Sequence, residues 1–384
     1  MTMEISKKVE QLAPSGIRAF FDLVLGMKDV ISLGVGEPDF VTPWHIREKA
    51  IFSLEEGFTS YTSNKGMLEL RRQIAHFLGH RYGMTYDPEE EILVTVGVSE
   101  GLDLAMRAIL NPGDKVLIPE PSYVSYRPVV ELAGGTPVIL TTTLENGFKL
   151  TPSQIEKACH KGVKAMMINY PCNPTGASYT KEELQAIARA AQRHNLFVIS
   201  DEVYDELTYD FPHTPLASLR GMKDHVLYFN GFSKAYAMTG FRIGWVCGPA
   251  KVVAAMTKIH QYTMLCAPIT GQMAAEEALK NGFKSVQEMK KEYNRRRRYI
   301  VGALNEIGLD CHMPQGAFYV FPSIGRTGET SMAFAQNLLK KKKVALVPGG
   351  AFGAAGEGYV RISYASSYEN LKEAVGRIKD YLKR

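Results

Sequence analysis

The feature that most limits the fold of this chain is the alternation of short apolar runs with amphipathic segments through its middle. Four such runs, each closed by polar residues, glycine or proline, are Val116–Ile118, Ala165–Ile168, Leu196–Ile199 and Val226–Phe229. Short continuous apolar runs are typical of strands that are buried on both faces. Because helix signals lie between them, the alternation predicts an α/β fold with a mainly parallel sheet.

Three segments carry the signals of helix starts. Thr151–Gln154 and Thr180–Glu183 have the spacing of a capping box, in which an N-terminal Thr and a Gln or Glu three residues later satisfy each other's backbone amides. Ser285–Glu288 opens a third predicted helix, which runs to Ile307 with Gly308 as its C-cap.

Composition excludes several classes of protein. The 384 residues are 45% hydrophobic and 22% charged, which excludes a disordered chain, and the net charge is only +5. The basic runs Arg295–Arg298 and Lys340–Lys343 lie on the polar side of helical patterns without interleaved aromatic residues, so they indicate solvated helix faces and no nucleic-acid partner. The sequence has no run of about 18 apolar residues and no apolar signal region, so we expect neither a membrane span nor secretion.

The cysteines point to a reducing, cytoplasmic location. Their number is odd, their spacing is wide and no Cys-x-x-Cys motif occurs, so we expect neither a disulfide framework nor a metal site. The five residues are Cys159, Cys172, Cys247, Cys266 and Cys311.

Polar residues follow three of the predicted strands, at the edge of a parallel sheet where ligands bind. Asn173 lies in the turn after the second run, Asp201 follows the third directly, and Lys234 comes shortly after the fourth. Each alone is typical of a turn, an N-cap or a surface cation. Together, with Tyr204 and Arg242 close behind, they indicate a functional site, because a buried acid without a partner is costly.

These strand ends resemble the signature of the class I/II aminotransferases, which are pyridoxal-phosphate-dependent enzymes of fold type I. The motifs are Asn173-Pro174-x-Gly176, Asp201-x-x-Tyr204 and Ser233-Lys234-x7-Arg242-x-Gly244. Further matches extend over nearly the whole chain, and they are Gly36–Asp39, Tyr61-x4-Gly66-x4-Arg71, Pro121–Tyr123, Pro348-Gly349-x-x-Phe352-Gly353 and Arg361–Tyr364.

The resemblance implies a division of the chain into two parts. A large cofactor-binding domain with a mainly parallel, mixed sheet spans residues 43–281. A small α/β domain is built from both chain ends, residues 1–42 and 282–384, and includes a predicted helix over Ser15–Leu25. Domain closure over the substrate is expected by analogy.

The resemblance also implies the roles around the cofactor ring. Lys234 would hold pyridoxal phosphate as a Schiff base and move the substrate proton, with its pKa lowered by desolvation and by Arg242. Asp201 would face the protonated pyridine nitrogen. Asn173 and Tyr204 would donate to the phenolic oxygen, and Tyr123 would stack on the ring.

The cofactor phosphate and the substrate need other residues. Arg242, Ser233 and the amides of Val98 and Ser99, at a predicted strand-to-helix junction, match the phosphate ligands. Tyr61 matches a tyrosine that reaches the phosphate of a neighbouring subunit, which implies a homodimer with shared sites.

For the substrate, Arg361 matches the residue that clamps the α-carboxylate. Gly36, Tyr123 and Asn173 also match substrate-contacting positions.

Two positions depart from the family's pattern. Gly231 stands where many members have a serine phosphate ligand, and Ser99 stands where some aspartate-specific members have a lysine. The expected reaction is a ping-pong transfer of an amino group from an L-amino acid to a 2-oxo acid, with 2-oxoglutarate as the expected acceptor. The donor stays open among aspartate or glutamate, aromatic amino acids, alanine and N-acetyl-diaminopimelate.

Three other functions compete with this one. A lyase or synthase on the same scaffold would use the same cofactor residues. A transcription regulator with an aminotransferase-like domain would need a DNA-binding module, for which the pattern, beginning at about Ile31, leaves no room. A Rossmann dehydrogenase would need a Gly-x-Gly-x-x-Gly motif after a strand, and none occurs.

Overall fold

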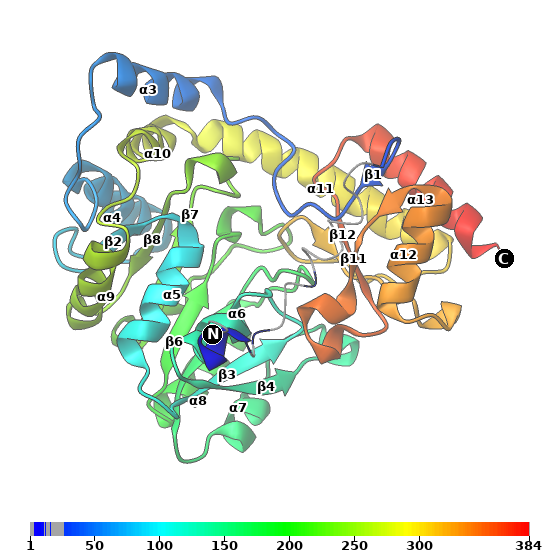
Figure 1. Cartoon of the computed structure of the whole chain (residues 1–384), viewed down its shortest axis with the longest axis horizontal. Coiled ribbons are helices and arrows are strands. Elements are labelled where there is room, and N and C mark those ends of the chain that lie inside the picture. The colour runs from blue at the N-terminus through cyan, green and yellow to red at the C-terminus, as the bar shows by residue number, and fades with distance from the viewer. Residues whose placement is uncertain (1–3, 11, 13–15, 17–26, 384) are drawn as a thin grey trace.

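A seven-stranded sheet forms the centre of the computed structural model, which describes residues 4–10, 12, 16 and 27–383. Figure 1 shows the sheet wrapped by helices, with strand order β2-β8-β7-β6-β5-β3-β4. The strands are β2 (Ile92–Thr95), β3 (Lys115–Glu120), β4 (Thr136–Thr141), β5 (Val163–Asn169), β6 (Phe197–Asp201), β7 (Val226–Gly231) and β8 (Gly244–Cys247).

The four predicted strands are confirmed as β3, β5, β6 and β7, and they pair in parallel together with β4. Only β8 runs antiparallel to both of its neighbours, so the sheet is mixed and mainly parallel, as the sequence predicts. The register places Asn169 beside Asp201, and Asp201 beside Phe229. The polar residues that follow these strands therefore leave the sheet at one edge.

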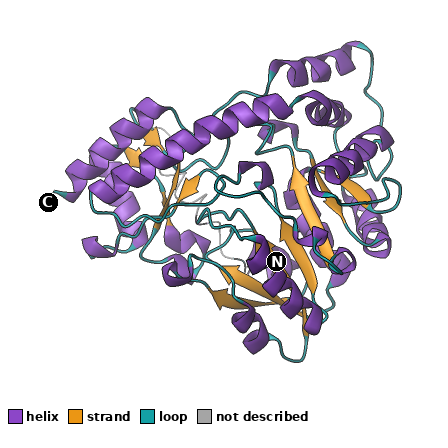
Figure 2. Cartoon of the chain, turned by 180° about the vertical axis from the view of Figure 1, so that it is seen from behind, coloured by secondary structure: helices purple, strands orange, loops and turns teal. Residues whose placement is uncertain are grey.

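Helices cover both faces of this sheet, as Figure 2 shows from behind. One face packs against α3, α4, α7, α8 and α10, and the other against α5, α6 and α9. Their bounds are α3 (Trp44–Glu55), α4 (Leu68–Tyr82), α5 (Gly97–Ile109), α6 (Tyr126–Leu132), α7 (Pro152–Ala158), α8 (Lys181–Arg193), α9 (Ala250–Thr263) and α10 (Ile269–Asn281). Coverage on both faces explains why the strands are continuously apolar.

Both predicted capping boxes are formed. The Thr180 hydroxyl accepts from the Glu183 amide, and the Glu183 carboxylate accepts from the Thr180 amide at 2.8 Å. Thr151 and Gln154 make the same reciprocal pair at the start of α7.

The third predicted helix begins two residues earlier than expected. It is α11 (Phe283–Glu306), and only Gly282 separates it from the end of α10. Because the chain passes straight from one helix into the next, Ser285 lies inside the first turn and does not cap it. The C-terminal end is close to the prediction, since Ile307 caps the helix and Gly308 follows it with a φ of +82°.

The rest of the chain packs around α11 in a second core. It contains a three-stranded antiparallel sheet, a two-stranded sheet and two further helices. The elements are β9 (Tyr319–Val320), β10 (Val344–Ala345), β11 (Val347–Pro348), β12 (Val360–Ser363), α12 (Ser331–Lys342) and α13 (Tyr368–Leu382). β1 (Ile31–Ser32) pairs with β10, so a segment near the N-terminus joins this C-terminal core (Figure 1).

We propose, as the sequence predicts, a large unit of residues 43–281 and a small unit of residues 1–42 and 282–384. The pairing of β1 with β10 and the burial of Leu33 in the C-terminal core support this division. Except for Gly16, the predicted helix Ser15–Leu25 lies outside the described residues. Before it in the chain lies the short helix α1 (Lys7–Glu10). In the described part of the chain, none of the helices combines the length and hydrophobicity that crossing a membrane requires.

Candidate active site

A cavity of about 700 Å³ opens where the ends of β5, β6 and β7 meet the start of α5 and the C-terminal core. All the predicted site residues except one line this cavity, and they are Gly36, Val98, Ser99, Tyr123, Asn173, Asp201, Tyr204, Ser233, Lys234, Arg242 and Arg361. The exception is Tyr61, which lies in the loop after α3 and is 82% exposed. A single chain therefore brings together every predicted residue but the one assigned to a neighbouring subunit.

Lys234 lies in the loop after β7 and points its amine into the cavity. Its Nζ donates to the Gly36 carbonyl oxygen at 2.7 Å. The pKa of Lys234 is lowered to about 8, first by burial and then by the positive charge of Arg361, whereas Glu37 and Asp201 oppose the shift. The contribution of Arg242, which the sequence predicted, has the expected sign but is smaller than that of Arg361.

Asp201 ends β6, and its carboxylate is buried. Oδ2 accepts from the Tyr126 hydroxyl at 2.6 Å, and Oδ1 accepts from the Val203 amide at 3.4 Å. Burial raises the pKa of Asp201 to about 6, although both hydrogen bonds and the nearby Lys234 favour the charged form. A cation placed against this carboxylate would stabilise its negative charge.

Arg361 comes from β12 of the C-terminal core and is 2% exposed. Its Nη1 donates to Asn173 Oδ1 at 2.9 Å, and its Nη2 donates to the Gly34 carbonyl at 2.6 Å. Among the residues described, nothing accepts from its buried Nε. A planar guanidinium with an unused donor suits an anionic ligand, above all a carboxylate.

Two tyrosines lie next to Arg361, and one of them, Tyr204, lines the cavity. The hydroxyls of Tyr204 and Tyr319 are hydrogen-bonded at 2.8 Å, and the Arg361 guanidinium carbon lies 4.5 Å from the Tyr319 ring centre. A Cβ on Gly36 would lie 2.9 Å from the Tyr319 hydroxyl. The site therefore needs glycine at position 36 because the backbone passes close to this hydroxyl.

The amino end of α5 faces the cavity through Val98 and Ser99. Gly97 starts the helix with a φ of +71°, and a Cβ there would lie 2.6 Å from Arg242 Nη2. Arg242 itself has a left-handed φ of +57° and donates from Nη1 to the Thr239 carbonyl at 3.0 Å. Free amides at a helix start beside a guanidinium form an anion-binding site.

The structure adds residues that sequence reasoning did not assign. Tyr126 contacts Asp201, and Tyr319 contacts Tyr204. Asn169 donates from Nδ2 to the Asp201 carbonyl at 2.8 Å and accepts from the Asn173 amide at 2.9 Å. Only Asn169 carried a signal, since it follows the apolar run of β5 directly.

Metal chemistry has no candidate here. Across residues 4–10, 12, 16 and 27–383, no group of three or more histidine, cysteine or acidic side chains could hold a metal ion. The cavity instead gathers three cations, Lys234, Arg242 and Arg361, against the two carboxylates Glu37 and Asp201. This balance suits an anionic organic ligand.

A lysine amine and a carboxylate at the strand ends of such a sheet, beside a helix start that can bind phosphate, define a pyridoxal-phosphate enzyme of fold type I. Comparison with known proteins agrees. The model of the family "Aminotransferase class I and II" matches residues 28–378. The chain belongs to this family.

Relatives and solved structures match nearly the full length. The putative aminotransferase YugH of Bacillus subtilis is 54% identical, over 100% of this chain and 99% of the relative. The aspartate aminotransferase of Pyrococcus abyssi is 47% identical, over 99% of both chains. The crystal structure of the aromatic aminotransferase of Pyrococcus horikoshii has a TM-score of 0.91 at 47% identity, covering 96% of this chain and 98% of that one.

Membership settles the reaction class and the cofactor. The chain is an aminotransferase that depends on pyridoxal phosphate, and its substrates are an amino acid and a 2-oxo acid. The expectation of a fold type I α/β structure is confirmed.

Proposed function

We propose that this chain transfers the amino group of an L-amino acid to 2-oxoglutarate by a ping-pong reaction, with Lys234 as the residue that attaches the cofactor and moves the proton. The observation that carries the proposal is the position of the Lys234 amine, in one cavity with the Asp201 carboxylate and the Arg361 guanidinium. The cofactor supplies an electron sink that accepts the charge released at the substrate Cα.

The residues present fit pyridoxal phosphate. Asp201 would hold the positive charge of the pyridine nitrogen, because its buried carboxylate has no cation bound to it within the described residues. Asn173 and Tyr204 would bind the phenolic oxygen, and Tyr123 would stack on the ring.

The start of α5 at Val98 and Ser99, with Ser233 and Arg242, would bind the phosphate. With Gly231 in place of a serine, this binding relies on Ser99, Ser233 and Arg242.

Arg361 would bind the substrate α-carboxylate and orient the Cα–H bond toward Lys234. The guanidinium is held from two sides by Asn173 and Gly34, so its position is fixed before a substrate arrives. Preorganised charge of this kind avoids the cost of ordering the side chain during binding. Gly36 leaves room for the substrate beside Tyr319.

Cofactor capture should depend on pH through Lys234. Only the uncharged amine reacts, and the pKa of Lys234 is lowered to about 8. In the cofactor-free chain, the rate of capture should rise about tenfold per pH unit below pH 7 and level off above pH 9. Stopped-flow absorbance between pH 6 and 10 measures this. A rate that keeps rising to pH 10 would mean an unshifted amine.

Replacing Asp201 by asparagine should lower kcat by about 10²-fold or more, because the side chain keeps its shape but loses the charge that faces the pyridine nitrogen. The thermal midpoint should not fall, because the neutral amide is easier to bury than a carboxylate. Steady-state kinetics and thermal unfolding of the two proteins test this. A kcat within about threefold of the wild type would contradict the assignment.

The role of Tyr61 requires a homodimer, which we propose as the functional assembly. Large exposed side chains gather on the loop after α3 and on the end of α9 with the loop that follows it, and a hydrogen bond from Asn64 Nδ2 to the Leu265 carbonyl at 2.7 Å joins the two segments. Among them are Phe58, Tyr61, Tyr262, Met264 and Leu265. Such exposed apolar clusters are typical of interaction sites. Sedimentation analysis should show twice the chain mass of 42.6 kDa.

The amino donor stays open among aspartate or glutamate, aromatic amino acids, alanine and N-acetyl-diaminopimelate. A panel of these donors, each tested with and without 2-oxoglutarate, would identify it. Each true donor alone should convert the bound cofactor to its pyridoxamine form and release one equivalent of 2-oxo acid. Ammonia and pyruvate without that form would indicate a lyase and contradict the proposal.

A cytoplasmic location stays part of the proposal. It is supported by the cysteines, all five of which lie in the described part of the chain and are free thiols.

A further inference from the structure

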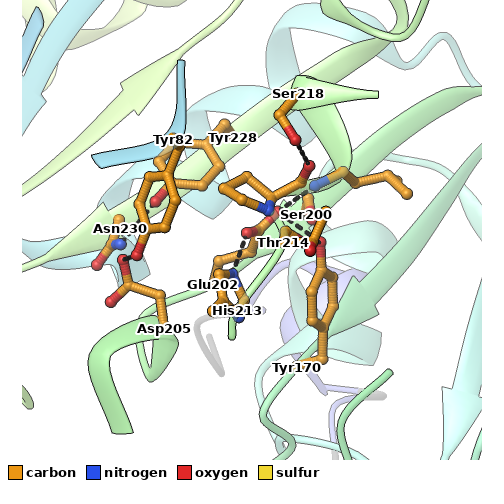
Figure 3. A network of polar contacts seen from close by, with 12 residues as sticks. Tyr82, Tyr170, Ser200, Glu202, Asp205, His213, Thr214, Ser218, Tyr228 and Asn230 are labelled. Carbon is orange, nitrogen blue, oxygen red and sulfur yellow. Dashed lines mark hydrogen bonds and ion pairs between the residues drawn. The ribbon is translucent and has the colours of Figure 1, made fainter. Parts of the chain in front are cut away.

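A second carboxylate, which the reaction as proposed does not use, follows Asp201 directly. Glu202 has 0% exposure, and Figure 3 shows it at the centre of a buried polar network. Its Oε1 accepts from the Ser200 hydroxyl at 2.6 Å, the Tyr170 hydroxyl at 2.9 Å and the Leu216 amide at 3.2 Å. Its Oε2 pairs with His213 Nε2 at 2.6 Å. Four partners thus fix both oxygens.

These partners connect the three strands whose ends carry the chemistry. Tyr170 follows β5, Ser200 lies in β6, and the Glu202 amide donates to the carbonyl of Phe229 in β7 at 2.9 Å. The Glu202 carbonyl then accepts from the Asp205 amide at 2.9 Å, which closes the turn around Tyr204. The backbone on either side of Glu202 is therefore held by contacts in several directions.

The stability of the fold alone does not account for this arrangement. A buried pair of polar or charged side chains is often no more stabilising than apolar residues of the same size, because the polar groups lose their hydration. Hydrogen bonds, unlike apolar packing, also fix direction, since each donor must point at its acceptor. A carboxylate with four directed contacts therefore defines the position of its backbone more narrowly than a leucine could.

We propose that Glu202, paired with His213, is a positioning residue for transamination, which holds Asp201 and Tyr204 at their places relative to Lys234. The proposal rests on the proposed function for the roles of those three residues. Glu202 does not line the cavity, so its effect reaches the reaction only through its neighbours.

Two substitutions test this, with a matched control. Glu202→Ala removes all four side-chain contacts. Glu202→Gln keeps the shape, because its side-chain carbonyl can accept from Ser200 and Tyr170 while its amide group stays within hydrogen-bonding reach of His213. The control is Glu206→Ala, which removes another buried carboxylate of the same segment, bound by Arg81 at 2.8 and 3.0 Å and absent from the cavity lining.

The measurements are the dissociation constant of pyridoxal phosphate, the pH at which the visible absorbance of the bound cofactor titrates, and the thermal midpoint. Glu202→Ala should weaken cofactor binding by about tenfold or more and displace the titration by about half a pH unit. Glu202→Gln should restore binding to within about threefold of the wild type. Glu206→Ala should lower the thermal midpoint and leave the other two quantities unchanged.

Two results would overturn the proposal. The first is a Glu202→Ala chain with a lower thermal midpoint but normal cofactor affinity and titration, which would make the network purely structural. The second is a Glu206→Ala chain whose cofactor titration is displaced by as many pH units as that of Glu202→Ala. A wild-type chain that fails to take up the cofactor on Lys234 would instead refute the proposed function. Even in that case, hydrogen exchange in the cofactor-free chain tests whether Glu202 holds the backbone of residues 201–204. Their amides should lose protection from exchange in Glu202→Ala and keep it in Glu206→Ala.

Discussion

Replacing Lys234 by alanine should reduce transamination by about 10⁴-fold or more, because the chain loses the amine that we propose both attaches the cofactor and moves the proton. The fold should survive, since the amine makes one side-chain hydrogen bond, to the Gly36 carbonyl. Borohydride reduction of the wild type, followed by peptide mapping, should place the cofactor on Lys234. The variant should still bind pyridoxal phosphate without forming a reducible bond.

Lys290 is a suitable control for this experiment. Burial also lowers the pKa of its amine, but Lys290 lies in α11 and does not line the cavity. Lys290→Ala should therefore keep its activity and its borohydride label. Label on Lys290, or a fully active Lys234→Ala chain, would refute the assignment. Either result would mean that a lysine with a lowered pKa can attach the cofactor without lying in the cavity.

Replacing Arg361 by lysine should lower kcat/KM by about 10²- to 10³-fold, although the positive charge is kept. The guanidinium contacts Asn173 and Gly34 with two nitrogens and keeps Nε free. A single ammonium group cannot reproduce this planar set of donors while also binding a carboxylate. The affinity for the cofactor should change little, so the variant should lose kcat/KM through weaker binding of the substrate.

Arg297→Lys is the matched control for Arg361. Arg297 is also a buried arginine with fixed partners, the Asp210 carboxylate and the Pro314 carbonyl, but it lies in α11 outside the cavity. This variant should lose thermal stability and keep its kcat/KM. Equal losses of kcat/KM in the two variants would mean that Arg361 acts through stability and not by binding the substrate.

Much of the site could be predicted because its chemistry is concentrated in short segments after strands. Asp201 and Lys234 each follow an apolar run. Parallel pairing brings the carboxyl ends of such strands to one edge of the sheet, independently of the conformation of the loops between them. The contacts that tune these residues were not predictable in this way. Tyr126 meets Asp201 across 75 positions and Arg361 meets Asn173 across 188, and no local pattern encodes such pairs.

The fold shows the same limit. The continuous apolar strands were evident, whereas β4 has exposed or half-buried residues along most of its length, and β8 begins at a glycine and runs against its neighbours. The capping pattern at Ser285 predicts a start of α11 two residues later than the observed one, at Phe283. The end of α10 at Asn281 decides that boundary, and it depends on tertiary packing.

The antiparallel strand β8 has a consequence for how the enzyme holds its two small molecules. Lys234 and Arg242 lie on the single connection between β7 and β8, whose ends are tied at Gly231 and Gly244. Two of the residues proposed to hold the cofactor, the lysine that attaches it and the arginine beside its phosphate, therefore belong to one β-hairpin. Arg361 belongs to the C-terminal core, so a movement of that core would tighten or loosen the grip on the substrate while the cofactor stays seated.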